Sequence, residues 1–208
     1  MATFAQDEEV KKNEEIRTLL GNNLKYGGFM GLSVNYSILN DVNAIVLGAR
    51  AGWVINHSLT LGLGGAGFIS EAFAAPAGIP ELSGTDYRIA GGYGGFLIEP
   101  TLFAKKPIHV TFPIIIGVGG VSYFEDYRET NVDNWEDTTQ DDDGFFVIEP
   151  GVQMEINLLK FLRLDVGAQY RYTSKVNLES FDVNPKPLTD DNVLNGLSYG
   201  ITLKFGWF

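Results

Sequence analysis

The sequence predicts an all-β protein, an eight-stranded antiparallel up-and-down transmembrane β-barrel that follows a short N-terminal segment. Three observations support this fold. Apolar and polar side chains alternate with a period of two, the apolar rows are long, and short connections alternate with long ones. A tilted strand needs roughly 9–11 residues to cross a bilayer, and the apolar rows reach that length.

The first 24 residues are expected to precede the barrel. Residues 1–6 (MATFAQ) look like the end of a secretory signal peptide, with Thr3 and Ala5 at the −3 and −1 positions; an ordinary start is the alternative. Residues 7–24 are predicted to be a periplasmic segment. Within it, 7–20 form a short charged helix that caps the barrel or contacts a partner, or else a frayed leader. The barrel is predicted over residues 25–208.

Alternation predicts eight strands, at 25–39, 43–56, 58–70, 87–103, 107–124, 145–157, 160–172 and 194–208. Tight turns are expected at 56–58, 104–106 and 157–159. Long polar loops are expected at 70–86, 125–144 and 173–193, and only 40–42 is a short connection on that side. Membrane barrels have short periplasmic turns and longer external loops, so both termini are placed in the periplasm.

The orientation of the two strand faces follows from the same alternation. The apolar row of the last strand consists of Leu197, Tyr199, Ile201, Leu203, Phe205 and Trp207. Because such rows are long and end in aromatic residues, we interpret them as lipid-facing and the polar rows as lumenal. In the third to fifth strands glycine is too frequent for the faces to be assigned. Pro100 and Pro150, in two Ile-Glu-Pro repeats, each remove a ladder donor, and a bulge is expected at each.

Composition narrows the possible classes further. The chain has 208 residues, enough for one small domain, and its 25 glycines fit a tightly curved sheet. It has no run of 18 apolar residues, which excludes transmembrane helices. The absence of cysteine excludes disulfides and thiolate chemistry. The net charge of −11 argues against binding to nucleic acid, which requires a basic surface.

Charged side chains on the polar rows are the first candidate site. They are Arg50, Glu99, Glu149, Glu155, Arg163, Asp165, Arg171 and Lys204. An eight-stranded barrel has an interior that side chains can fill, and buried charges must be paired. We therefore expect a structural network that plugs the lumen, with an ion path or proton relay as the alternative. A glycosidase pair of Glu99 and Glu149 is disfavoured, because no sugar cleft is predicted between them.

The acidic stretch 125–143 is the second candidate site, with nine carboxylates and one arginine. It lacks the spacing of an EF-hand, and a solvated loop is the simplest interpretation. Divalent cations that bridge it to lipopolysaccharide phosphates are the functional alternative. The aromatic residues Tyr123, Phe124, Tyr127 and Trp135 can anchor a protein partner or pack the loop.

The chain resembles the eight-stranded outer-membrane barrels of the OmpA/OmpX superfamily, and is most similar in look to small barrels of Bacteroidota. The predicted strands, the segment Pro107–Tyr123 and the two Ile-Glu-Pro repeats carry this resemblance. It implies the outer membrane of a Gram-negative bacterium, contact with its lipid and lipopolysaccharide, and insertion by the barrel-assembly machinery. Phe205, Trp207 and Phe208 look like the C-terminal signal which that machinery reads, although Phe208 is out of phase with the apolar row.

Small membrane barrels also include a lipid A palmitoyltransferase with catalytic His and Ser. Here the two histidines, His57 and His109, are expected in a turn and at a strand end, with no triad partners. We therefore predict no catalytic residue, no cofactor and no metal site. The favoured function is a non-enzymatic barrel that acts through its external loops or rim, in attachment or envelope integrity or as an accessory subunit of an outer-membrane complex. The alternatives are a small pore or transporter, a lipid-modifying barrel enzyme and a soluble lipocalin-like barrel.

Overall fold

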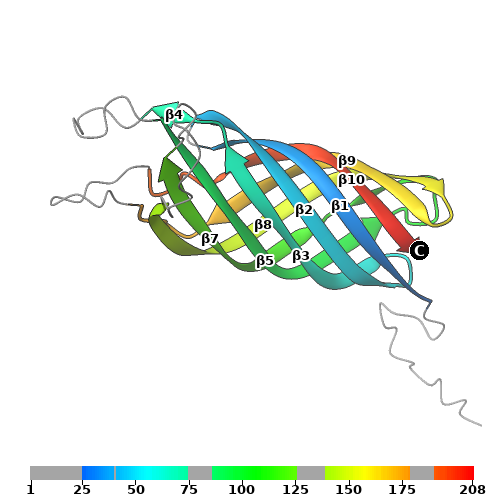
Figure 1. Cartoon of the computed structure of the whole chain (residues 1–208). Coiled ribbons are helices and arrows are strands. Elements are labelled where there is room, and N and C mark those ends of the chain that lie inside the picture. The colour runs from blue at the N-terminus through cyan, green and yellow to red at the C-terminus, as the bar shows by residue number, and fades with distance from the viewer. Residues whose placement is uncertain (1–24, 40, 75–85, 126–138, 179–189) are drawn as a thin grey trace, which may run out of the picture.

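The structure is a computed structural model that describes residues 25–39, 41–74, 86–125, 139–178 and 190–208. Within these residues the strands form one antiparallel sheet that closes on itself (Figure 1). The strands are β1 (Tyr26–Leu39), β2 (Val42–Ile55), β3 (Leu59–Ser70), β4 (Phe73–Ala74), β5 (Asp86–Leu102), β6 (Ile108–Thr111), β7 (Ile114–Glu125), β8 (Thr139–Leu159), β9 (Leu162–Thr173) and β10 (Gly196–Trp207).

Each wall strand pairs with the strands before and after it in the sequence. The ring closes because β1 pairs with β10, and β3 pairs with β5. The short β4 pairs only with β5, while β6 and β7 are two parts of one wall strand, so eight strands surround the lumen. The predicted eight-stranded up-and-down barrel is confirmed. No helix among the described residues is long and apolar enough to cross a membrane.

The bulges predicted at the two prolines are wrong. Pro100 pairs with Leu59 within an unbroken register, and its carbonyl still accepts a hydrogen bond from the Phe112 amide at 3.0 Å. The register between β8 and β9 is the same on both sides of Pro150. Each proline therefore removes one donor from the ladder, and the neighbouring pairs hold the strands in register without an extra residue. Register shifts occur instead between Tyr123 and Phe124 and between Asn157 and Leu159.

Two strands differ from the prediction by more than a residue or two at an end. The fifth wall strand is interrupted at Phe112 and Pro113, although Pro113 still accepts a hydrogen bond from the Gly151 amide at 2.7 Å. β8 begins at Thr139, six residues earlier than predicted, because its ladder with β7 continues into the acidic stretch. Backbone pairing does not require apolar side chains, so the apolar pattern marks only part of a strand that continues beyond it.

The outer wall is apolar and the inner wall is not. Large apolar side chains on the outward positions of the wall strands are exposed, and Trp207 is 81% exposed. The inward positions of the same strands carry buried charged and polar side chains near one end of the barrel. The predicted faces of β1, β2, β8, β9 and β10 are therefore confirmed.

Glycine on the inner face of β5 and β7 makes room for aromatic rings. A Cβ added to Gly119 would lie 2.5 Å from Cζ of Phe145 and 2.7 Å from Cβ of Tyr93. A Cβ added to Gly91 would lie 2.7 Å from Cζ of Phe68. These strands thus combine bulky inward residues with inward glycines, which is why their faces are hard to assign from sequence.

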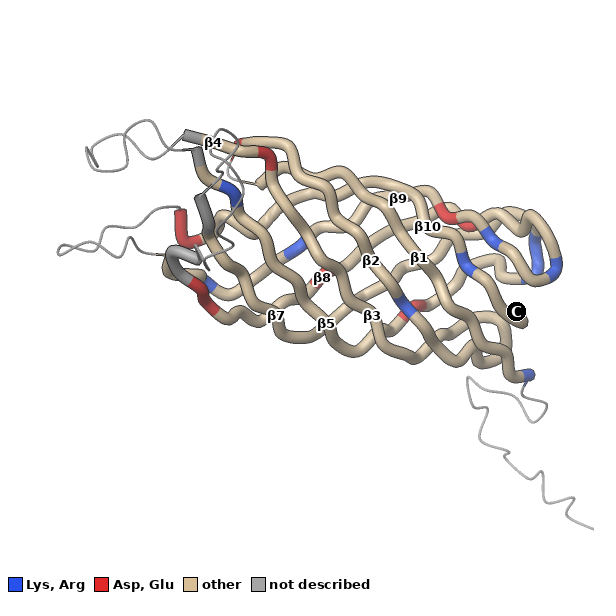
Figure 2. Tube along the Cα trace, in the orientation of Figure 1, with Lys and Arg blue, Asp and Glu red and all other residues tan. Residues whose placement is uncertain are grey.

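The two ends of the barrel differ in connections and in charge (Figure 2). We call the end with the connections β2–β3, β5–β6 and β8–β9 the turn end, and the opposite end the loop end. Asn56 and His57, in the β2–β3 connection, both have positive φ angles (51° and 59°), as the two central residues of a type I′ turn require. The exposed charged residues of the described turn end are lysines, namely Lys25, Lys105, Lys106 and Lys160.

Candidate functional site

The polar part of the lumen contains a cluster of ion pairs near the turn end. Its side chains come from five wall strands, so only the closed barrel brings them together. They are Arg50 of β2, Glu99 of β5, Glu155 of β8, Arg163 and Asp165 of β9, and Lys204 of β10. We call this set the lumen cluster.

Lys204 lies at the centre of the lumen cluster. Its Nζ is 2.6 Å from Oε1 of Glu99 and 3.0 Å from Oδ2 of Asp165, and it also donates to Glu155. The ammonium lies 4.8 Å from the ring centroid of Phe29, which covers it toward the turn end. A fully buried ammonium would be very costly alone, and three carboxylates compensate it here.

Arg50 contacts two of the same carboxylates from β2, which β1 separates from β10. Its Nη1 is 3.1 Å from Oε2 of Glu99, and its Nη2 is 2.7 Å from Oδ2 of Asp165. The Nη2 group also donates to the side-chain carbonyl of Gln153 at 2.6 Å. Arg50 therefore bridges β2 to β5, β8 and β9 across the lumen.

Glu155 binds two further residues on its other oxygen. Its Oε1 accepts from Nη1 of Arg163 at 2.6 Å and lies 2.5 Å from Nε2 of His109. His109 is fully buried, stands opposite Glu155 in the β6–β8 register, and its Nδ1 lies 3.2 Å from the carbonyl of Lys106. The expectation of a peripheral strand-end histidine missed this lumenal contact.

The lumen cluster is balanced in formal charge. Three cations, Arg50, Arg163 and Lys204, face the three carboxylates of Glu99, Glu155 and Asp165. All of these groups are buried or nearly so. Such a network is stable only if its members remain together, because removal of one partner leaves an uncompensated buried charge.

The remaining two predicted charges lie in a separate layer toward the loop end. Oε2 of Glu149 accepts a hydrogen bond from the Tyr93 hydroxyl at 2.5 Å. Arg171 is fully buried, donates from Nε to the carbonyl of Leu194 at 2.8 Å, and lies 5.0 Å above the ring of Phe68. Arg171 and Glu149 are close enough to interact electrostatically. The structure thus splits the predicted set of eight into six charges and two.

Apart from Glu149, Arg171 and a few buried serines, the loop-end half of the lumen is packed with apolar side chains, which corrects the expectation of polar inward rows along the whole barrel. The stacked rings of Tyr87 and Tyr123, with centroids 4.7 Å apart, lie in this half. Tyr123 is fully buried, so it packs the interior and offers no anchor to a partner. One buried cluster contains Leu39, Ala44, Val46, Phe68, Tyr87, Ile89, Tyr93, Val121, Tyr123, Phe145, Val147, Val176, Leu178, Val193 and Leu194.

Two cavities lie against the lumenal charges, and both are very small. One, beside Lys204 and Phe208, has a volume of about 10 Å³; the other, beside Arg50 and Glu149, has about 20 Å³. A cavity of this size holds about one water molecule. In these regions the side chains themselves fill the lumen.

The C-terminal aromatic residues divide between the two faces of β10. Phe205 and Trp207 point outward, whereas the ring of Phe208 stacks on Phe29 with centroids 6.1 Å apart. The guanidinium carbon of Arg163 lies 3.7 Å from the centre of the Phe208 ring. Phe208 therefore covers the lumen cluster at the turn end, which explains why it is out of phase with the apolar row.

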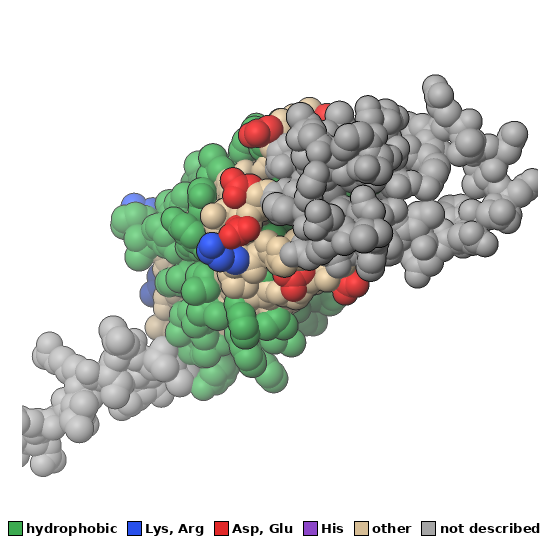
Figure 3. All heavy atoms as spheres, turned by 90° about the vertical axis from the view of Figure 1, so that its left-hand side faces the viewer, with side chains coloured by type: hydrophobic (Ala, Val, Ile, Leu, Met, Phe, Trp, Pro, Cys, Tyr) green, Lys and Arg blue, Asp and Glu red, His purple; other side chains and the backbone are tan. Residues whose placement is uncertain are grey.

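The loop end presents carboxylates around the mouth of the barrel (Figure 3). Asp41, Glu71, Asp142 and Asp190 are exposed there. Nζ of Lys175 lies 2.7 Å from Oδ2 of Asp191, and this hydrogen bond raises the pKa of Lys175.

The predictions for the acidic stretch and the N-terminal segment fall largely outside the described residues. Tyr127, Trp135 and residues 1–24 lie there, as does most of 125–143. Among the residues that the structure describes, no group of three or more His, Cys, Asp or Glu is placed to hold a metal ion. His57 is in the β2–β3 turn, as predicted.

The structure is similar to solved outer-membrane barrels. Neisserial surface protein A (NspA) is 12% identical to this chain and gives a TM-score of 0.50, with 88% of this chain and 98% of NspA covered. A major outer membrane protein from Thermus thermophilus is 11% identical and gives a TM-score of 0.51, with 86% and 99% covered. No family model and no curated protein matches the sequence. The predicted outer-membrane β-barrel fold is therefore confirmed from structure alone.

Proposed function

We propose that this protein is a non-conducting, non-enzymatic barrel of the outer membrane that acts through its loop-end surface. Its exposed apolar wall fits the hydrocarbon core of a bilayer, with aromatic residues such as Trp53, Trp207 and Tyr172 toward the two ends. Both termini are then periplasmic and the loop end is extracellular. Insertion by the barrel-assembly machinery, with Phe205, Trp207 and Phe208 as the signal, belongs to the same proposal.

The filled lumen is the observation that carries the proposal. A pore needs a continuous aqueous path, whereas here a balanced cluster of ion pairs is followed along the barrel by a second charged layer and an apolar cluster. The charged residues contact each other rather than lining open space. This arrangement supports a structural plug over the ion path or proton relay.

Conductance in planar bilayers tests the plug. Refolded protein, checked for insertion by its heat-dependent mobility on gels, is expected to give no discrete channels at concentrations where a general porin conducts. Steady, reproducible channels of uniform size would favour the small pore or transporter instead.

The acidity of the loop end indicates which partners it fits. A surface with exposed Asp41, Glu71, Asp142 and Asp190 attracts a basic protein surface, or divalent cations that bridge it to lipopolysaccharide phosphates. Attachment, envelope integrity and an accessory role in an outer-membrane complex are all compatible with such contacts.

Cross-linking in intact membranes, followed by purification in mild detergent, tests this role. A specific partner protein or lipopolysaccharide is expected to co-purify with the chain. The double variant Asp142→Lys, Asp190→Lys is expected to weaken this association. Lys105→Gln at the turn end is the matched control and should have no effect. Loss of the association on chelation would indicate bridging cations, and recovery of a lone monomer would contradict the accessory-subunit role.

A further inference from the structure

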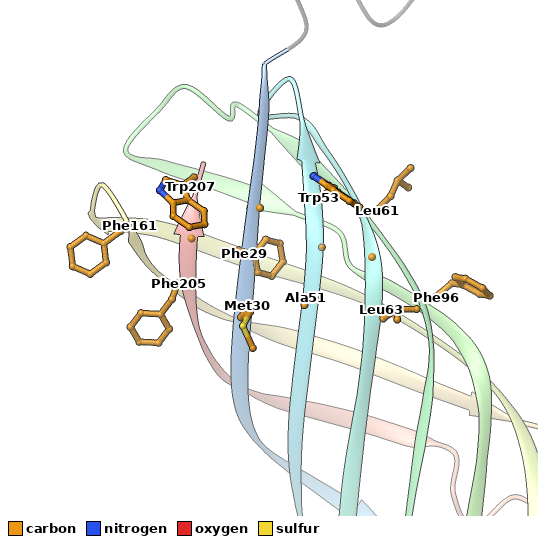
Figure 4. A pocket seen from close by; sticks show the side chains of 14 residues that line it. Phe29, Met30, Ala51, Trp53, Leu61, Leu63, Phe96, Phe161, Phe205 and Trp207 are labelled. Atoms are coloured by element: carbon orange, nitrogen blue, oxygen red, sulfur yellow. The ribbon is translucent and has the colours of Figure 1, made fainter.

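A groove on the outer wall lies close to the turn end (Figure 4). It has a volume of about 980 Å³ and crosses β10, β1, β2 and β3. Its floor lies at Gly28, which is paired with Trp207 on one side and with Trp53 on the other. The two indoles are 81% and 72% exposed, so a slot one strand wide separates two projecting aromatic rings. We call this feature the Trp slot.

The residues that line the Trp slot are uncharged, and exposed lysines lie in the neighbouring segments at the turn end. Met30, Phe205 and Phe161 continue its walls. At the turn end, exposed Lys25 immediately precedes β1, three residues before Gly28, and exposed Lys160 immediately precedes the slot residue Phe161. The described connections at this end carry no exposed carboxylate, so nothing in them offsets these cations.

We propose that the Trp slot binds one anionic phospholipid of the surrounding leaflet, with an acyl chain over Gly28 and the phosphate near Lys25 and Lys160. Three features match this ligand. The volume is in the range of ligand sites, tryptophans favour the depth at which a chain meets its headgroup, and lysine near a membrane surface attracts anionic lipid. The inference rests on the proposed membrane insertion, which the experiment below tests separately.

Gly28 provides a substitution that fills the slot without disturbing the wall. A Cβ at this position would meet only the Gly52 carbonyl, at 3.5 Å, which is ordinary contact. Gly67 is the matched control, because it also faces outward and its Cβ would meet only the Gly91 carbonyl at 3.7 Å. Gly28→Leu therefore blocks the slot, and Gly67→Leu adds the same side chain elsewhere on the outer wall.

Quenching of tryptophan fluorescence by brominated lipid measures occupancy. The experiment uses the full chain with Trp135→Phe, so that Trp53 and Trp207 give the signal, in vesicles of brominated phosphatidylglycerol mixed with unlabelled phosphatidylcholine. The reverse labelling, with brominated phosphatidylcholine and unlabelled phosphatidylglycerol, gives the comparison. Flotation of protein with the vesicles reports insertion independently.

We expect phosphatidylglycerol to be preferred over phosphatidylcholine by roughly fivefold for each lysine that reaches the phosphate, and so by about 25-fold if both do. Lys25→Gln with Lys160→Gln should abolish the preference, and Gly28→Leu should reduce both preference and quenching, while Gly67→Leu leaves both unchanged. Equal quenching by the two lipids in floating protein would overturn the site and leave a barrel with ordinary annular lipid. Absence of quenching in floating protein would mean that protein covers the slot, which also overturns it. Failure to float would contradict membrane insertion itself.

Discussion

Gly119 and Gly120 are neighbours in β7, but there is room for a side chain only at Gly120. A Cβ on Gly119 would lie 2.5 Å from the Gly92 carbonyl oxygen and 2.5 Å from Cζ of Phe145. A Cβ on Gly120 would meet only the Asp143 carbonyl, at 3.8 Å. The difference arises because one faces the filled lumen and the other faces outward.

We expect Gly119→Ala to destabilise the barrel by about 1–3 kcal/mol, the usual cost of overpacking. The new methyl group would clash with the Gly92 carbonyl oxygen, and a backbone oxygen cannot rotate away as a side chain can. Gly120→Ala should leave stability nearly unchanged. Urea unfolding of both variants in the same lipid gives the comparison. Equal stability of the two variants would show that the lumen is looser than the structure indicates.

Lys204 is the residue on which the balance of the lumen cluster most depends. Lys204→Met retains much of the side-chain volume but leaves three carboxylates facing Arg50 and Arg163. Breaking a buried pair in this way costs about 3–5 kcal/mol. We expect a loss of that size in the free energy of unfolding, measured by tryptophan fluorescence.

A second substitution distinguishes charge from packing at the same place. Adding Glu99→Gln to Lys204→Met restores the formal balance and should recover part of the lost stability. Lys175→Met, which removes the exposed partner of Asp191, should change little, because exposed ion pairs are screened by solvent. A double variant no more stable than Lys204→Met would indicate that packing, not charge balance, governs the effect.

At the scale of elements, sequence reasoning succeeded where a strand shows both of its faces. In β1, β2, β8, β9 and β10 the outward row is apolar and the polar or charged residues fall on the other row, so the outer and inner residues are assigned correctly. In β3, β5 and β7 glycine occupies both rows and carries no signal about either face. The apolar interior of the loop end, which includes Phe68, Tyr87 and Tyr123, was therefore not predicted.

The same limit applies to the candidate site. Five of the six charges of the lumen cluster lie on strands whose faces are clear, which is why their common inward direction could be predicted. The sixth, Glu99, lies on the glycine-rich β5. His109 lies on a short strand beside a proline interruption, and its partner Glu155 is far away in sequence. The two residues meet because the register between β6 and β8 pairs them. That register cannot be read from a single sequence.

Substitutions of the two last aromatic residues are expected to affect the rate of assembly and the stability of the barrel separately. Trp207 projects outward, whereas Phe208 covers the lumen cluster against Phe29 and Arg163. We expect Trp207→Ala to slow insertion by the assembly machinery with little change in unfolding, and Phe208→Ala to lower stability with less effect on the rate. Pulse-chase insertion and urea unfolding measure the two quantities, and reversed effects would place the assembly signal on Phe208.

At the scale of the whole molecule, the barrel is asymmetric in a way that predicts its orientation. The described turn end exposes lysines and has short connections, while the loop end exposes carboxylates and has the long ones. Short turns are typical of the periplasmic side and long loops of the external side of membrane barrels. The lengths of the connections therefore predict a loop end outside the cell.

The absence of cysteine from the chain allows a direct test of this orientation. Ser58→Cys places a thiol in the β2–β3 turn, and Asp142→Cys places one near the loop end of β8; both positions are exposed. A membrane-impermeant maleimide applied to intact cells is expected to label Asp142→Cys and not Ser58→Cys. After the outer membrane is permeabilised, both should react, which controls for accessibility of the turn. Labelling of Ser58→Cys alone in intact cells would invert the barrel, because no rearrangement of loops could expose a turn on the opposite side of the bilayer.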